Sequence, residues 1–308
     1  MTSNSHTTVL PAPPREPAGR GRVRGDVVPA MLFLAPAVLM ALAVRIWPTL
    51  RAVWDSLHST PLGARPSSWA GLEQYTSLFS DPGFINSLKI TLLFGLVVNP
   101  LQIAVSLALA VLFNERIRGG SLMRTLVFLP VAIPQSVSAV IWVIAFRPDG
   151  PLNGVLEGVG LPEQRFLTSP TQALPSLIVV VSWIGVGYWM MFLIAGLKEI
   201  DPALYDAASI DGASRWQRFR HITLPQLHRQ IGFVLVADTI SNLLVFAPVQ
   251  ILTGGGPNGR TDLIMNNVFE RAYISGDTGS AAAGTVIVVL LALAIVLGQF
   301  RLLSRGSK

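Results

Sequence analysis

The sequence contains no cysteine, and charged residues make up only 13% of its 308 residues. Without cysteine, a disulfide, a thiol nucleophile and a cysteine-ligated metal are all excluded. A soluble domain carries about 25% charged residues, so half of that value indicates a chain that lies largely in lipid. Apolar residues account for 51% of the chain and are gathered into long blocks. We therefore predict a membrane protein.

The sequence also lacks the short motifs of common ATP-driven and hydrolytic enzymes. A P-loop ends in Gly-Lys-Ser or Gly-Lys-Thr, and no Gly-Lys pair occurs in the chain. Neither H-E-x-x-H nor G-x-S-x-G is present, and the four histidines form no such motif. We therefore predict that the chain is not an enzyme and has no catalytic, cofactor-binding or metal-binding residues of its own.

Six apolar blocks are each long enough to cross a hydrocarbon core of ~30 Å, which needs about 20 helical residues. They comprise residues 27–47, 90–113, 125–146, 173–197, 231–252 and 281–300. Membrane strands would show alternating segments of about ten residues, so the predicted fold is an all-α polytopic membrane protein with six transmembrane helices. Prolines inside the blocks, such as Pro100, Pro130 and Pro134, fit this fold because neighbouring helices can satisfy the freed carbonyls.

The basic residues predict the orientation of the chain. With both ends placed inside, fifteen of the 23 basic residues fall in inner segments and eight in outer ones. The positive-inside rule then predicts that both termini are cytoplasmic. Residues 1–26 are rich in Pro, Gly, Ser, Thr and Arg and are expected to form a disordered tail. An alternative is a signal-peptidase site at Ala41-Leu42-Ala43, but the uncleaved helix is long enough to span, and Arg45 and Pro48 follow.

The segment between the fourth and fifth blocks has the pattern of two short helices joined by a sharp turn. Asp201 is a suitable N-cap, and Pro202 suits the first helical position. Gly212 is placed to end the first helix in a left-handed conformation. Ser214 and Gln217 have the capping-box spacing for a second helix. A simple connection between two membrane helices does not need a helix pair with defined caps and a defined turn. We therefore predict a docking element, in which a helix binds in a groove of a partner protein.

The same segment, residues 201–225, carries a longer pattern: Asp206-Ala207-Ala208, then Gly212, then Ile222 and Leu224-Pro225. It resembles the EAA loop of bacterial binding-protein-dependent ABC importers, with Asp206 where that family usually has Glu. Three further segments are similar to carbohydrate-type permeases of the maltose and glycerol-3-phosphate kind, namely residues 112–130, 251–261 and 299–305. The resemblance extends over most of the chain.

The resemblance implies a permease subunit of an ABC sugar importer, with several passes through the bacterial plasma membrane. The implied partners are a second homologous permease, an ATPase dimer that holds ATP and Mg²⁺, and an extracytoplasmic solute-binding protein. No nucleic acid is implied. The cytoplasmic loop would supply the coupling helices that fit a cleft on the ATPase, and its implied coupling residues are Asp206, Ala207, Ala208, Gly212, Ile222, Leu224 and Pro225.

Polar and aromatic side chains inside the blocks are the candidates for the path of a sugar, since aromatic faces and amides suit sugar rings. They are Asn99, Gln102, Trp183, Tyr188, Trp189, Asp238, Asn242 and Gln250. Each could equally serve helix packing or the membrane interface. Asp238 lies about eight residues into its block, where a charge is costly unless it faces a wet or paired site. A secondary transporter that uses Asp238 as a proton site is therefore the alternative function.

Overall fold

The computed structural model of the protein describes residues 27–59, 68–115 and 119–305, and the tail predicted over residues 1–26 lies outside them. Short turns of other helix types, labelled η, connect several of the α-helices. The elements in chain order are α1 (Val27–Ala41), η1 (Leu42–Ile46), α2 (Trp47–Asp55), β1 (His58–Ser59), β2 (Ser68–Trp69), α3 (Glu73–Ser80), α4 (Pro82–Asn114), α5 (Gly120–Phe128), η2 (Leu129–Ala132), α6 (Gln135–Ala145), α7 (Pro151–Gly158), α8 (Ala173–Glu199), α9 (Pro202–Ile210), α10 (Arg215–Arg218), η3 (Phe219–Thr223), α11 (Leu224–Gln226), α12 (His228–Leu243), α13 (Ala247–Leu252), α14 (Ile264–Phe269), η4 (Glu270–Ile274) and α15 (Thr278–Arg305).

The chain divides into two compact units, residues 1–50 and 51–308. In the first unit, α1 and η1 form one apolar helical run that continues into α2. Its large apolar side chains are exposed, and Phe33 keeps 88% of its accessible surface. A helix that is apolar all round is typical of a segment that lipid or another protein covers.

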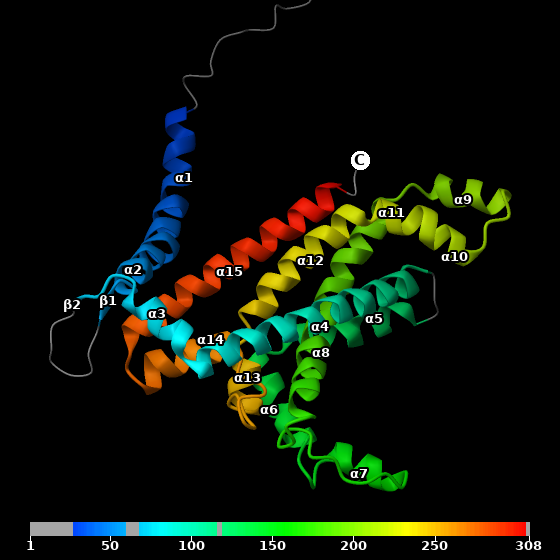
Figure 1. Cartoon of the computed structure of the whole chain (residues 1–308). Coiled ribbons are helices and arrows are strands. Elements are labelled where there is room, and N and C mark those ends of the chain that lie inside the picture. The colour runs from blue at the N-terminus through cyan, green and yellow to red at the C-terminus, as the bar shows by residue number, and fades with distance from the viewer. Residues whose placement is uncertain (1–26, 60–67, 116–118, 306–308) are drawn as a thin grey trace, which may run out of the picture. The chain divides into compact units, whose positions relative to one another are not determined.

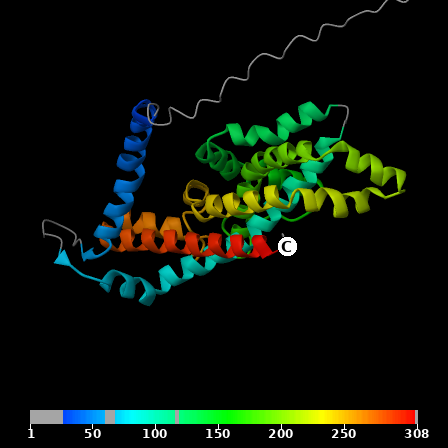
Figure 2. The ribbon, with the colours of Figure 1, turned by 90° about the horizontal axis from the view of Figure 1, so that it is seen from above.

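The second unit is a helical bundle built around two long helices, α4 and α8, which pack along each other (Figures 1 and 2). Side chains on α4 donate hydrogen bonds to carbonyl groups of α8: Gln102 to Val181 at 2.9 Å and Ser106 to Val186 at 3.0 Å. In turn α12 packs against α4 and α15. At 33 residues, α4 is ~50 Å long, more than enough to cross a bilayer core of ~30 Å.

Gly187 marks a close approach between α8 and the α5–η2 segment. A Cβ built at Gly187 would lie 2.2 Å from the carbonyl oxygen of Val127. No side chain fits at that distance, so the backbones can pack there only because glycine lacks a Cβ. Small residues that allow such close approach are characteristic of helix packing in membranes.

The predicted all-α polytopic class is confirmed, but the predicted number of six spans is not. Over the described residues, four helices are long and apolar enough to cross a membrane: Met31–Asp55, Pro82–Asn114, Ala173–Glu199 and Thr278–Leu303. A fifth candidate is the pair Gly120–Ala132 and Gln135–Ala145, which is bent by 103°. The only strands in this part of the chain are β1 and β2, a two-residue antiparallel pair in which His58 faces Trp69.

Two of the predicted spans are broken helices, and a proline accounts for each break. In the third block, Ile133 precedes Pro134 and is extended, with φ −93° and ψ 129°, because a residue before proline disfavours the α conformation. In the fifth block, α12 ends at Leu243 and α13 begins at Ala247. Pro248 has no N–H to donate to the carbonyl of Leu244, which favours a break in the helix at this point.

An ion pair joins the beginning of α4 to η4. The Asp81 carboxylate caps α4 by accepting a hydrogen bond from the Gly83 amide at 2.8 Å, and it also pairs with the Arg271 guanidinium. Partial burial raises the pKa of Asp81, but the Gly83 amide and Arg271 outweigh it, so the pKa lies below its ordinary value. The charged form of Asp81 therefore stabilises this end of the bundle.

Candidate functional site

Polar side chains from α4, α8 and α12 form one hydrogen-bonded network inside the bundle. The Trp189 indole donates to Asp238 Oδ1 at 2.6 Å. The Asn242 amide donates to Asn99 Oδ1 at 2.8 Å, and to Gln102 Oε1 and Asp238 Oδ1 at 3.1 Å each. All five side chains are buried. Because unpaired polar groups are costly in an apolar interior, this network fixes the relative positions of the three helices.

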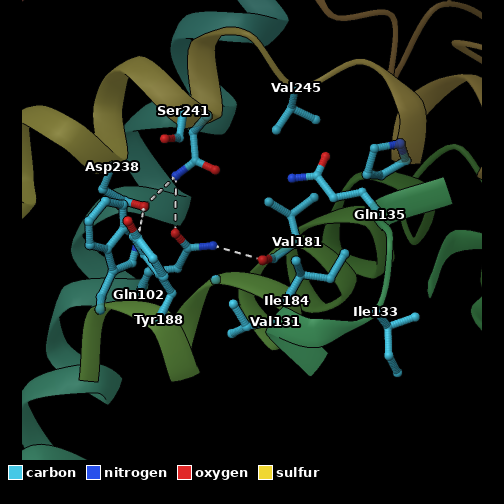
Figure 3. A pocket seen from close by; sticks show the side chains of 14 residues that line it. Gln102, Val131, Ile133, Gln135, Val181, Ile184, Tyr188, Asp238, Ser241 and Val245 are labelled. Carbon is cyan, nitrogen blue, oxygen red and sulfur yellow. Dashed lines mark hydrogen bonds between the residues drawn. The ribbon is translucent and has the colours of Figure 1, made fainter. Parts of the chain in front are cut away.

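A cavity of about 190 Å³ opens beside the network, between α4, α8, α12 and the η2–α6 segment (Figure 3). It combines two aromatic rings, three amides, a hydroxyl and a carboxylate with aliphatic walls. Its lining residues are Gln102, Val131, Ile133, Gln135, Val181, Ile184, Gly185, Tyr188, Trp189, Asp238, Ser241, Asn242, Val245 and Pro248. A few placed polar groups in a mainly apolar cavity are characteristic of a small-molecule site.

Five of the eight residues predicted for a substrate path line this cavity, namely Gln102, Tyr188, Trp189, Asp238 and Asn242. Asn99 is hydrogen-bonded to Asn242 but lines a second cavity, of about 300 Å³, between α4, α12 and α15. Trp183 packs edge-on against Trp142, with ring centroids 5.6 Å apart, and Gln250 is exposed on α13. Neither Trp183 nor Gln250 lines the first cavity.

Two polar lining residues, Gln135 and Ser241, were not predicted. Both are polar residues inside an apolar block, which is the signal that identified the other candidates. Ser241 lies three positions after Asp238 on α12, so the two share a helix face. Gln135 begins α6 immediately after the bend, and its place at the cavity follows from that bend.

A second candidate element is the helix pair formed by α9 and α10, and its predicted local geometry is confirmed. The Asp201 carboxylate caps α9 by accepting from the Ala203 amide at 2.9 Å, and Pro202 is the first residue of α9. Gly212 ends the first helix with φ +76°. Ser214 and Gln217 form a capping box at the beginning of α10.

The pair projects beyond the ends of α8 and α12 (Figure 1) and presents an apolar face to its surroundings. Ala203, Ala207 and Ile210 lie along one side of α9, and Ile210 keeps 87% of its accessible surface. Trp216 on α10 is 65% exposed. An exposed apolar patch framed by polar residues is typical of a surface that contacts another protein.

The other side of the pair is fixed to the bundle. The hydroxyls of Tyr205 on α9 and Thr223 on η3 are hydrogen-bonded at 3.0 Å, whereas the Arg218 guanidinium donates to the Ser209 hydroxyl at 2.9 Å within the pair and joins α10 to α9. Tyr205 and Ile222 also pack against the core cluster that contains Leu227. Of the predicted coupling residues, Ala208 and Ile222 are half-buried, and the exposed ones are Asp206, Ala207, Gly212, Leu224 and Pro225. Over the described residues, no cluster of three His, Asp or Glu side chains could hold a metal ion.

Comparison with known proteins gives relatives along nearly the whole chain. It is 35% identical over 285 residues to the probable ABC transporter permease protein YesP of Bacillus subtilis, with 91% of each chain covered. It is 32% identical over 276 residues to the trehalose/maltose transport system permease protein MalF of Thermococcus litoralis, covering 88% of this chain and 93% of the relative. It is 29% identical over 276 residues to the sn-glycerol-3-phosphate transport system permease protein UgpA of Agrobacterium fabrum, covering 89% and 94%.

A solved structure has the same architecture. A chain of a bacterial ABC transporter involved in the import of the acidic polysaccharide alginate is 26% identical, with a TM-score of 0.82 over 93% of this chain and 98% of that one. Residues 102–307 match the family model described as the inner membrane component of binding-protein-dependent transport systems. This match includes the capped helix pair and all but Asn99 of the buried network. With more than half of its length matched, the chain belongs to the family of inner membrane components of binding-protein-dependent transport systems.

Proposed function

We propose that this chain is a permease subunit that imports a sugar or a related carbohydrate, together with a second permease and at the expense of ATP hydrolysed by separate ATPase subunits. The capped α9–α10 pair carries this proposal. It has a fixed inner side, an exposed apolar outer side and the residue pattern of the EAA loop. A rigid helix with small exposed residues is suited to a groove on a partner protein.

The relatives support a carbohydrate as the substrate. Their names refer to trehalose and maltose, to sn-glycerol 3-phosphate and to alginate. The amides, hydroxyl and aromatic rings around the 190 Å³ cavity are groups that can bind sugar hydroxyls and sugar faces. This volume is below the ~300–1,000 Å³ of complete small-molecule pockets. We therefore infer that the cavity is one wall of the pathway and that a second permease supplies the other.

The proposed assembly contains a solute-binding protein on the outer side and the ATPase dimer, with ATP and Mg²⁺, on the cytoplasmic side. One related solved complex includes a periplasmic protein bound to an alginate pentasaccharide. In this assembly both termini of the chain are cytoplasmic, as the excess of basic residues in the inner segments predicts. Family membership gives no support to the alternative of a proton-coupled transporter that uses Asp238.

The experiment that tests the proposal uses the exposed alanine of the docking face. Ala207→Trp should place a bulky ring between α9 and its partner, whereas Ala207→Ser should preserve the close approach. Each variant is produced in cells that contain the complete transporter, and the ATPase that co-purifies with the permease is quantified. We expect the Trp variant to lose most of the ATPase and the Ser variant to retain it, at equal amounts of permease in the membrane.

The proposal fails if the permease co-purifies with no ATPase, or if Ala207→Trp retains both the ATPase and carbohydrate uptake. A second arm addresses the proton-coupled alternative. Uptake should survive an uncoupler while the ATP concentration is held constant, and its collapse under these conditions would support the alternative.

A further inference from the structure

The 190 Å³ cavity beside the buried network has, on the walls that the structure describes, an acidic side chain but no basic one. Among the described residues that line it, Asp238 is the only acid, and none is an arginine, a lysine or a histidine. Every other polar group on its walls is an amide, an indole, a phenol or a hydroxyl. A ligand in this cavity therefore encounters one acidic group and no cationic side chain to balance a negative charge of its own.

The two oxygens of Asp238 are used differently. Oδ1 accepts hydrogen bonds from the Trp189 indole at 2.6 Å and from the Asn242 amide at 3.1 Å. Oδ2 is buried and has no hydrogen-bond partner within the described residues, and Asp238 as a whole is only 1% exposed. An unpaired buried oxygen is costly, so a donor supplied by a ligand would be strongly favoured there. The two hydrogen bonds to Oδ1 (Figure 3) hold the carboxyl plane in place, so Oδ2 also has a fixed position.

A second uncommitted group stands in the same cavity. The Gln135 amide lines it and makes no hydrogen bond within the part of the chain that the structure describes. In Figure 3 this amide is directed toward Val181 and Val245, in the space beside the network. Gln135 offers both a donor and an acceptor, whereas Asp238 Oδ2 offers an acceptor. Hydroxyl groups can satisfy both residues, because each hydroxyl donates one hydrogen bond and accepts others.

From this arrangement we infer that Asp238 makes the pathway selective for uncharged polyhydroxyl ligands, that is, neutral sugars. Oδ2 accepts a hydrogen bond from a sugar hydroxyl, and the same carboxylate repels a phosphate or a uronate group. The inference rests on the proposed function and chooses between the neutral and the anionic substrates for which the relatives are named. With an effective dielectric constant of about 20, the repulsion between two negative charges about 5 Å apart weakens the binding of an anionic ligand roughly a hundredfold or more.

The test offers the complete transporter both kinds of substrate at once. Cells that express the transporter receive an equimolar mixture of maltose, trehalose, glycerol 3-phosphate and alginate trisaccharide, and depletion of each compound is measured by mass spectrometry. Cells that lack this chain provide the background. We expect depletion of one or both neutral sugars and of neither anionic compound.

The variant Asp238→Asn isolates the unpaired atom. Its amide oxygen can take the place of Oδ1 and keep the bonds from Trp189 and Asn242, while an NH₂ group replaces Oδ2. A charged acceptor thus becomes a neutral donor. We expect the ratio of neutral to anionic uptake to fall at least about tenfold, because a charge-assisted bond to the sugar is lost and a donor to the anion is gained. The matched control is Asp55→Asn, which removes the same charge outside the cavity and should leave the ratio unchanged.

The possible outcomes separate this inference from the function on which it rests. Depletion of glycerol 3-phosphate or alginate trisaccharide by the wild-type transporter would overturn the inference and leave sugar import intact. An Asp238→Asn variant that loses neutral and anionic uptake in equal proportion would show that Asp238 is only structural. Depletion of none of the four compounds would contradict the proposed function itself. The wild-type measurement decides the charge preference of the complete transporter even if the variant is absent from the membrane.

Discussion

The turn between α9 and α10 offers the sharpest test of the docking element, because its conformation depends on one residue. Gly212 has φ +76°, and a Cβ placed there would meet no atom within 4 Å. A substitution at this position is therefore penalised by backbone conformation alone and not by a clash. A left-handed conformation costs an L-residue about 1–2 kcal/mol, and a β-branched residue is the least tolerant. Asparagine adopts this conformation several times more readily than most residues.

Gly212→Val should therefore lower the population of the present turn conformation, relative to other conformations, by roughly tenfold or more. A free-energy difference of ~1.4 kcal/mol corresponds to a factor of ten in an equilibrium. The present turn is closed by hydrogen bonds from the Ala213 amide to the Ala208 carbonyl at 2.9 Å and from the Gly212 amide to the Ser209 carbonyl at 3.2 Å. When these bonds are lost, α10 and its exposed Trp216 no longer keep a fixed position beside α9. Docking onto a partner requires a preformed surface, so its affinity should fall in proportion.

The assay is co-purification of the ATPase with the permease, together with carbohydrate uptake and a measurement of permease in the membrane. We expect Gly212→Val to reach the membrane at the normal level, to retain about a tenth of the bound ATPase and to lose uptake. Gly212→Asn is the matched control and should behave almost as the wild type. Full ATPase binding and full uptake in the Val variant would refute the reasoning, because the segment would then be only a connection between helices.

Three further predictions concern packing, electrostatics and topology. Gly187→Ala should lower the melting temperature of the detergent-solubilised protein, because its Cβ would lie 2.2 Å from the Val127 carbonyl oxygen and overpacking costs about 1–3 kcal/mol. Gly298→Ala, with open space around it in α15, should be neutral or stabilising and serves as its control. Asp81→Asn should lower the melting temperature at pH 7, and the gap from the wild type should close as the pH falls below about 4, since a carboxylate with a lowered pKa stabilises only while it is ionised. A gap that does not narrow at all as the pH falls from about 4 to about 2 would contradict the ion-pair account. Lys308→Cys, in a chain with no other cysteine, should react with a membrane-impermeant maleimide only after the cells are opened, and labelling of intact cells would place the C-terminus outside.

Local features of the fold could be predicted from sequence because residues within four positions of one another determine them. The N-cap at Asp201, the left-handed Gly212 and the capping box of Ser214 and Gln217 all appear as predicted. Each depends on a hydrogen bond or a backbone conformation inside its own turn, and tertiary packing did not override them.

The breaks in two predicted spans could not be derived in the same way. Pro134 and Pro248 lie at bends, whereas Pro100 lies inside the unbroken α4. A proline in a membrane helix either kinks it or is accommodated by neighbouring helices, and the outcome depends on packing that a single sequence does not specify. The sequence is apolar on both sides of each break, so hydropathy alone predicted continuous helices at both places.

The same limit applies to the cavity. Polar and aromatic character within an apolar block singled out Gln102, Asp238 and Asn242, which line the cavity, but it also selected Trp183 and Gln250, which do not. Which side of a helix faces the cavity depends on how the helices pack, and an apolar block has little amphipathicity to indicate it. The bend before α6 brings Gln135 to the cavity, and that bend was the feature that hydropathy concealed.

The chain order connects the two functional elements directly. The docking pair is flanked by α8, which ends at Glu199, and by the α11–α12 segment, where α12 begins at His228. Trp189 lies ten residues before the end of α8, and Asp238 lies ten residues after the beginning of α12, so each is ~15 Å from the end of its own helix that leads toward the docking pair. Their side chains meet in the 2.6 Å hydrogen bond at the cavity. A movement of α9 and α10 against the ATPase would act on both helices, and the Trp189–Asp238 contact joins those helices at the wall of the proposed sugar path. In the proposed transporter, a conformational change at the ATPase would therefore reach the cavity through the Trp189–Asp238 contact. Coupling between the ATPase and the cavity requires one structural element whose conformation both of them influence.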